Sequence, residues 1–65
     1  IQMFSLIGLR ADGATGAVDI IGVRTAEAAV TQARRFLSDH SICALVEVWR
    51  HGALIASIDA AEIRS

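Results

Sequence analysis

The sequence predicts a small α+β domain in which a four-stranded, mainly antiparallel sheet carries one helix on one face. Its 65 residues suit a single domain, residues 1–65, and no repeat, linker or proline interrupts them. Four strand-like runs occur in the order β-β-α-β-β. The one helical repeat lies between the second and third runs, which leaves a single helix to cover the sheet.

The first half of the chain predicts two strands joined by a loop. Residues 2–9 are rich in Phe, Leu and Ile, which favours a strand. Residues 10–16 contain two glycines and an Asp-Gly pair, which is typical of a loop. Residues 17–23 form a β-branched run and predict the second strand.

The helix is predicted to follow Thr25, whose hydroxyl can cap the first turn, with Glu27 complementing the helix dipole. Apolar residues then recur at helical spacing as far as Leu37, and residues 39–41 end the helix. At 1.5 Å per residue, about 14 residues return the chain by about 21 Å, roughly one strand length. The third strand therefore runs parallel to the second. Beside the first strand it is antiparallel, which predicts the order 2-1-3-4.

Residues 44–58 predict a hairpin with a two-residue turn, His51-Gly52, in which a positive φ is required. Apolar side chains occupy both of its faces. Asp59 can cap a short final turn in residues 60–63. Residues equally far from the turn are expected to face each other. The expected pairs are Trp49 with Leu54, Val48 with Ile55, Glu47 with Ala56, Val46 with Ser57, and Leu45 with Ile58.

One helix covers only one face of this hairpin. We predict that the face of Val48 and Ile55 meets the helix, because burying Glu47 in a core without a partner is costly. The opposite face is then too apolar to remain in water, and aromatic residues such as Trp49 are enriched at interfaces. In the alternative, Trp49 and Leu54 form the main core with Glu47 at its margin. The predicted interface residues are Leu45, Glu47, Trp49, Leu54 and Ile58.

Composition favours self-association and excludes several classes of partner. Apolar residues make up 54% of a chain too short to bury them all, and oligomerisation is a common remedy. The net charge of −1 creates no field that attracts nucleic acid or acidic membranes. The apolar runs fall far short of the about 20 residues that span a bilayer. The single cysteine, Cys43, permits no internal disulfide, and without a visible signal peptide we expect a cytoplasmic protein.

Candidate chemistry is sparse, and we predict no enzyme, metal or cofactor. Glu47 and His51 share a strand face, but they are four positions apart, which is about 13 Å along a strand, whereas proton transfer needs contact at about 3 Å. His40 and Cys43, with Asp39 adjacent, have the spacing of metal ligands, but a structural zinc site needs four ligands and the chain holds no second pair.

Two further patterns bear on ligand binding. The Gly13-to-Gly16 spacing matches the G-x-x-G loop of KH domains, but here the loop joins strands and carries Asp12, so we predict a turn. Arg24 and Thr25 at the helix start are a candidate anion site, because free N–H groups point outward there. Arg34 and Arg35 add positive charge without interleaved aromatic residues, so nucleic-acid binding is not expected.

One further pattern runs along the chain and consists of Phe4, Asp12-Gly13, Ala29 with Ala33, and Val46-Glu-Val48 with Gly52 and Leu54. In these residues the chain resembles short proteobacterial proteins of unknown function that have a β-β-α-β-β pattern. The resemblance covers nearly the whole length and departs where that pattern carries acidic residues, at Ser5 and in the hairpin turn. It implies no activity.

Together these observations predict a non-enzymatic module that forms a homodimer or binds a protein partner through an apolar sheet face. The rival prediction is a regulatory module that binds a small anion at Arg24 and Thr25.

Overall fold

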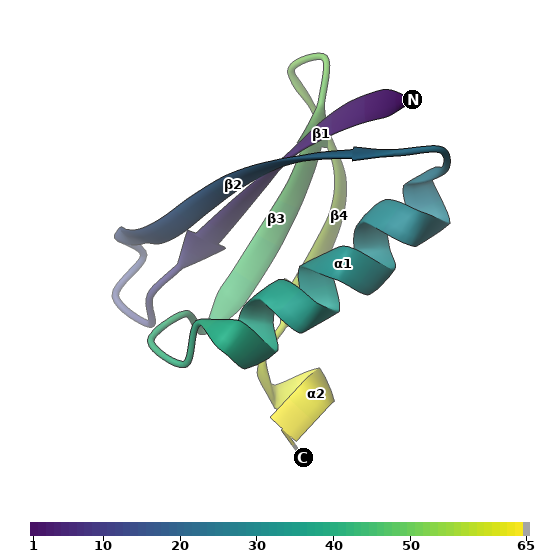
Figure 1. The fold of residues 1–65 in the computed structure, drawn as a ribbon. Helices are drawn as coiled ribbons and strands as arrows, with labels where there is room; N and C mark the ends of the chain where they lie inside the picture. The colour runs from purple at the N-terminus through teal and green to yellow at the C-terminus, as the bar shows by residue number, and fades with distance from the viewer. Residues whose placement is uncertain (65) are drawn as a thin grey trace.

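The computed structural model describes residues 1–64 and confirms the predicted fold class (Figure 1). Four strands form one open antiparallel sheet in the order β2-β1-β3-β4, as predicted. The helix α1 lies across one face of this sheet, and the opposite face carries no helix. The elements are β1 (Gln2–Leu9), β2 (Thr15–Val23), α1 (Ala26–Asp39), β3 (Leu45–Arg50), β4 (Ala53–Asp59) and α2 (Ala61–Arg64).

The β1–β2 connection contains a tight turn followed by a bulge. The Asp12 carboxylate accepts a hydrogen bond from the Ala14 N–H at 3.0 Å, and Gly13 has a φ of 88°, a left-handed conformation that favours glycine. The register shifts after Gly8, so that Gly16 is an extra residue in β2. Beyond the bulge Leu9 still pairs with Thr15, so β2 begins two residues earlier than the sequence predicts.

Side-chain hydrogen bonds hold both ends of α1, a local one at its start and a long-range one at its end. The Thr25 hydroxyl accepts from the Ala28 N–H at 3.1 Å, which confirms the predicted cap. At the other end, Arg64 donates to the Leu37 carbonyl at 2.7 Å and supplies the positive charge that the last turn of α1 lacks. The Asp59 carboxylate caps α2 through the Ala61 N–H at 2.8 Å, as expected.

The β3–β4 hairpin turns at the predicted residues but contains a bulge that changes its register. His51 and Gly52 both have a positive φ, 52° and 75°, and Trp49 pairs with Leu54 as predicted. The next pair is Val48 with Ala56, so Ile55 is an extra residue. From there the expected pairing is wrong by one residue. The observed pairs are Glu47 with Ser57, Val46 with Ile58, and Leu45 with Asp59.

The register shift moves Ile58 to the opposite face, because a slip of one residue reverses every side chain of a strand. Ile58 is only 4% exposed and belongs to the core beneath α1. Its predicted place on the interface face is therefore wrong. Val46 and Val48 are fully buried on the helix side, as predicted.

The core lies between α1 and the sheet. Gly8 of β1 allows close packing there, since a Cβ at this position would lie 2.6 Å from the Cys43 Sγ atom and 2.8 Å from the Phe36 ring. The core residues are Phe4, Leu6, Ile21, Val23, Ala29, Ala33, Phe36, Leu37, Cys43, Val46, Val48, Ile58 and Ala60.

Candidate interaction surface

The sheet face that α1 does not cover is the main candidate site, and we call it the open face. Side chains alternate between the two faces of a strand, so residues adjacent to core positions point away from α1. The pairing register brings these residues together across all four strands. The open face consists of Met3, Ser5, Ile7, Leu9, Thr15, Val18, Ile20, Gly22, Leu45, Glu47, Trp49, Leu54, Ser57 and Asp59.

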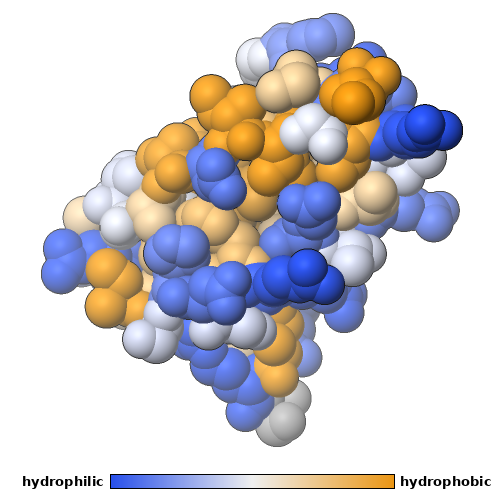
Figure 2. Space-filling view, viewed as in Figure 1, coloured by the Kyte–Doolittle hydropathy of each residue, from blue (hydrophilic) through white to orange (hydrophobic). Residues whose placement is uncertain are grey.

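The open face is predominantly apolar and accessible to water. Ile20 is 64% exposed, Val18 60%, Met3 56% and Leu54 49%. The apolar residues between them, including Trp49, are half-buried by their neighbours. Apolar side chains gather over β2 and the start of β1 in Figure 2, whereas hydrophilic side chains cover α1. Contiguous apolar surfaces of this kind usually mark interaction sites.

The main polar group in the middle of the open face already has a partner. The Trp49 indole Nε1–H donates to the Glu47 carboxylate Oε1 at 3.1 Å. These residues are two apart on β3, so their side chains share one face. The hydrogen bond satisfies the indole N–H and one carboxylate oxygen, which lowers the cost of covering this part of the face.

Four of the five predicted interface residues lie together on the open face: Leu45, Glu47, Trp49 and Leu54. Sequence reasoning considered only the hairpin and missed the contribution of β1 and β2. The sequence signal for this contribution is that apolar residues and glycine fill both alternate sets of positions in residues 3–9 and 17–23, with Ser5 and Asp19 as the polar exceptions. The additional apolar residues are Met3, Ile7, Leu9, Val18 and Ile20.

The rival anion site lies at the start of α1, where Thr25 is the N-cap. The Thr25 hydroxyl accepts the Ala28 N–H, which uses one of the free donors of the first turn. The Arg24 carbonyl accepts a hydrogen bond from the Gln2 side chain at 3.2 Å. The Glu27 side chain places a negative charge in the same turn. No observation on these residues favours an anionic ligand.

The two candidate metal ligands, His40 and Cys43, make contacts typical of residues that stabilise the fold. The His40 Nδ1 atom lies 2.8 Å from the Phe36 carbonyl oxygen, and the His40 ring stacks on the Phe36 ring at 4.2 Å. Cys43 is fully buried in the core. Among residues 1–64, no three His, Cys, Asp or Glu side chains form a group that could hold a metal ion. Within the same residues, no helix is long and apolar enough to cross a membrane.

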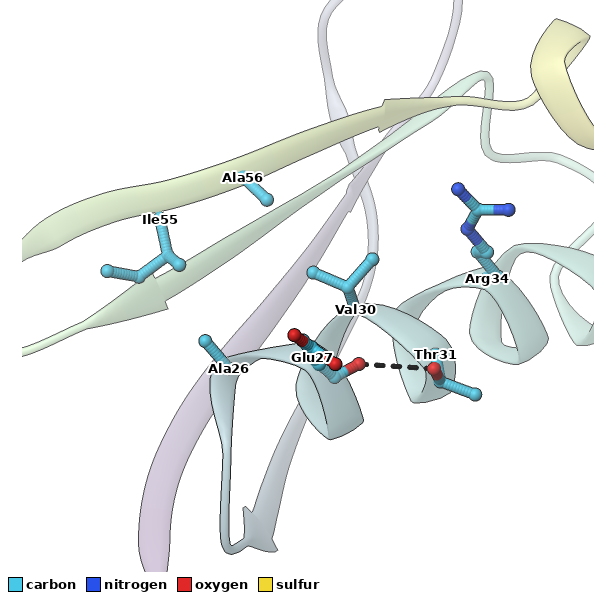
Figure 3. Close-up of a pocket in the computed structure, with 7 residues that line it drawn as sticks. All are labelled: Ala26, Glu27, Val30, Thr31, Arg34, Ile55 and Ala56. Carbon is cyan, nitrogen blue, oxygen red and sulfur yellow. Dashed lines mark hydrogen bonds between the residues drawn. The ribbon is translucent and has the colours of Figure 1, made fainter.

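A second surface feature is an open groove of about 620 Å³ between α1 and the edge strand β4 (Figure 3). It lies on the helix side of the sheet and is separate from the open face. Apolar side chains from both elements line it together with two charged residues and one hydroxyl group. The lining residues are Ala26, Glu27, Val30, Thr31, Arg34, Ile55 and Ala56.

Comparison with known proteins identifies no relative of this chain. No protein-family model, curated protein or solved structure matches the chain, so its resemblance to short proteobacterial proteins stays a prediction.

Proposed function

We propose that this chain is a small non-enzymatic module that forms a homodimer by pairing the open faces of two copies. The proposal rests on the observation that all four strands place large apolar side chains on a face that α1 leaves uncovered. A second copy offers the same apolar surface, so each copy can remove the other's side chains from water. The transfer of apolar surface out of water drives such an association.

The size of the open face suits a small dimer. Four strands spaced by about 4.8 Å, each about seven residues long, give a flat area of about 19 by 23 Å. This is about 440 Å², and side-chain relief raises the accessible area above the flat value. Small stable interfaces bury about 600 Å² per partner or more. Two such sheets would pack face to face at a separation of about 10 Å.

Trp49 is the proposed anchor of this dimer. It lies on β3, one of the two inner strands, and is flanked on the same face by Ser5 of β1 and Leu54 of β4. Its N–H group is satisfied within the chain, so burial against a second copy leaves no unpartnered indole donor. We expect Trp49→Ala to weaken association by about 2 kcal/mol, as truncation of an interface hot spot does.

Sedimentation equilibrium over a wide concentration range tests the proposal. Wild type should dimerise, whereas Ile20→Glu should remain a folded monomer, because it places a charge on an exposed part of the open face. Gln32→Glu is the matched control, since it makes the same charge change on the exposed side of α1 and should dimerise like wild type. Circular dichroism verifies that each variant is folded. A wild-type monomer, or a dimer that survives Ile20→Glu, would contradict the proposal.

The proposal includes a cytoplasmic location for the module. The sole cysteine of the sequence, Cys43, is a free thiol buried in the core. Stability of this fold therefore rests on packing and association, without a disulfide, which suits a reducing compartment.

A further inference from the structure

The edge strand β4 and the groove beside α1 form a second surface, independent of the open face. In the order β2-β1-β3-β4, β4 pairs with β3 on one side only. Its other side presents unpaired backbone groups, and such an edge can accept an additional strand. Figure 3 shows the side chains of Ile55 and Ala56 from β4 and those of α1 around the adjacent groove.

The ladder between β3 and β4 identifies which backbone groups of β4 are free. The Ala60 N–H donates to the Ala44 carbonyl at 2.8 Å, just beyond the paired residues Leu45 and Asp59. Antiparallel ladders alternate between residues that bond to the neighbouring strand and residues that do not. The backbone groups of Ile58 and Ala56 therefore point toward β3. Those of Ser57 and Asp59 point toward the free edge.

The groove has an apolar centre between two opposite charges. Val30 of α1 lies across from Ile55 and Ala56 of β4, and the groove volume of about 620 Å³ has room for an apolar side chain. Glu27 and Arg34 line the same groove seven residues apart on α1. At 1.5 Å per residue, their Cα atoms are separated by about 10.5 Å along the helix axis.

We propose that this edge and groove bind an extended peptide from a partner protein, added antiparallel to β4, with the pattern acidic-x-apolar-x-basic. Alternate side chains of an added strand point to the same face, so these three side chains would all face the groove. The acidic and basic residues, four positions apart, are separated by about 13 Å. Flexible side chains can bridge the difference from the spacing of Glu27 and Arg34.

The direction of α1 relative to β4 determines the order of the acidic and basic residues in the bound peptide. β4 runs opposite to β2, and α1 returns from the end of β2, so α1 and β4 run the same general way. Arg34 therefore lies toward the end of β4 and Glu27 toward its start. An antiparallel peptide begins beside the end of β4, which places its acidic residue near Arg34 and its basic residue near Glu27.

A peptide of another protein fits this groove better than a second copy of the chain. The other free edge of the sheet, β2, is the strand that a second copy could add. Its only acidic residue is Asp19, and the residue four positions later is Val23 rather than a basic one. The β2 edge therefore lacks the charge that Glu27 would bind.

Fluorescence anisotropy with synthetic peptides tests the proposal. The probe is a labelled, end-blocked Thr-Glu-Thr-Val-Thr-Lys-Thr peptide, and the comparison peptide exchanges its Glu and Lys. Wild type should bind the probe at least about fivefold more tightly than the exchanged peptide, because only the probe matches both charges. Arg34→Glu should remove this preference. Arg35→Glu, the control, makes the same charge change beside Asp19 on the other side of α1 and should retain it.

Amide hydrogen exchange reports whether the peptide adds to the β4 edge. Adding the probe should slow exchange at Ser57 and Asp59, whose N–H groups face the free edge, and leave Ile58 unchanged. Ile20→Glu should bind the probe like wild type, so failure of the dimer does not affect this result. Three outcomes would each overturn the proposal. The probe fails to bind, Arg34→Glu and Arg35→Glu change the preference for the probe equally, or Arg34→Glu changes the oligomeric state.

Discussion

The two faces of the sheet have similar compositions, but α1 covers only one of them. The covered face includes Phe4 and Leu6, each 1% exposed, whereas Met3, which precedes Phe4 and lies on the open face, is 56% exposed. The same contrast separates Ile21, at 9%, from the adjacent Ile20, at 64%. The strands thus carry apolar side chains on both faces, and the position of α1 decides which of them form the core. Apolarity alone does not distinguish a core from an interaction surface.

Truncation of one apolar side chain on each face of β1 should give the largest difference. Leu6→Ala removes a side chain that is 1% exposed and leaves a cavity, so we expect a loss of about 3 kcal/mol. Met3→Ala, on the open face of the same strand, should change stability by less than about 0.5 kcal/mol. Urea unfolding in an Ile20→Glu background compares the two as monomers. A Met3→Ala cost equal to that of Leu6→Ala would show that the open face is covered within the monomer.

Two glycines provide the same comparison for added volume. Gly8→Ala places a Cβ within 2.6 Å of the Cys43 Sγ atom under α1, and we expect overpacking to cost about 2 kcal/mol. Gly22→Ala on the open face places its Cβ 3.0 Å from the Ile1 Cγ2 atom and 3.2 Å from the Met3 Sδ atom. Both side chains are exposed and can move aside into water, so the cost should stay below about 0.5 kcal/mol. Thermal unfolding of both variants measures the difference, and equal shifts would contradict the assignment of faces.

Most of the fold follows from local signals in the sequence. Thr25 is in a position to cap a helix, and the helical spacing that follows it predicts α1. His51-Gly52 predicts the hairpin turn, because glycine tolerates positive φ and a two-residue loop requires it. The length of α1 then predicts the direction of the third strand, since a helix of one strand length returns the chain to the end of the sheet where the second strand began. The order 2-1-3-4 follows when the third strand is placed antiparallel beside the first.

The bulge at Ile55 was not predictable from residue type. Ile55 is β-branched and suits a regular strand, so nothing local marks it as an extra residue. Its consequence extends along β4, because Ile58 then faces the core. The contact between Arg64 and the Leu37 carbonyl is also invisible in the sequence, since 27 positions separate the two residues. Features that depend on tertiary placement are those that local patterns miss.

Loss of the hydrogen bond between Trp49 and Glu47 should destabilise the monomer less than Leu6→Ala or Gly8→Ala does. Trp49→Phe removes the indole donor and leaves the Glu47 carboxylate without it, which should cost about 1 kcal/mol in urea unfolding. Repeating the substitution in a Glu47→Leu background completes a double-mutant cycle that isolates the bond from the change in ring size. Equal costs in the two backgrounds would show that the hydrogen bond adds nothing to stability.

The same pair distinguishes a wet open face from one covered by a second copy. In the monomer, water can reach the half-buried Glu47 and replace the lost donor. Inside a dimer interface water is excluded, so an unpartnered carboxylate is more costly there than in the monomer. Trp49→Phe should therefore weaken dimerisation by more than the about 1 kcal/mol that it removes from the folded monomer. Sedimentation equilibrium of this variant, with and without Glu47→Leu, measures the extra cost.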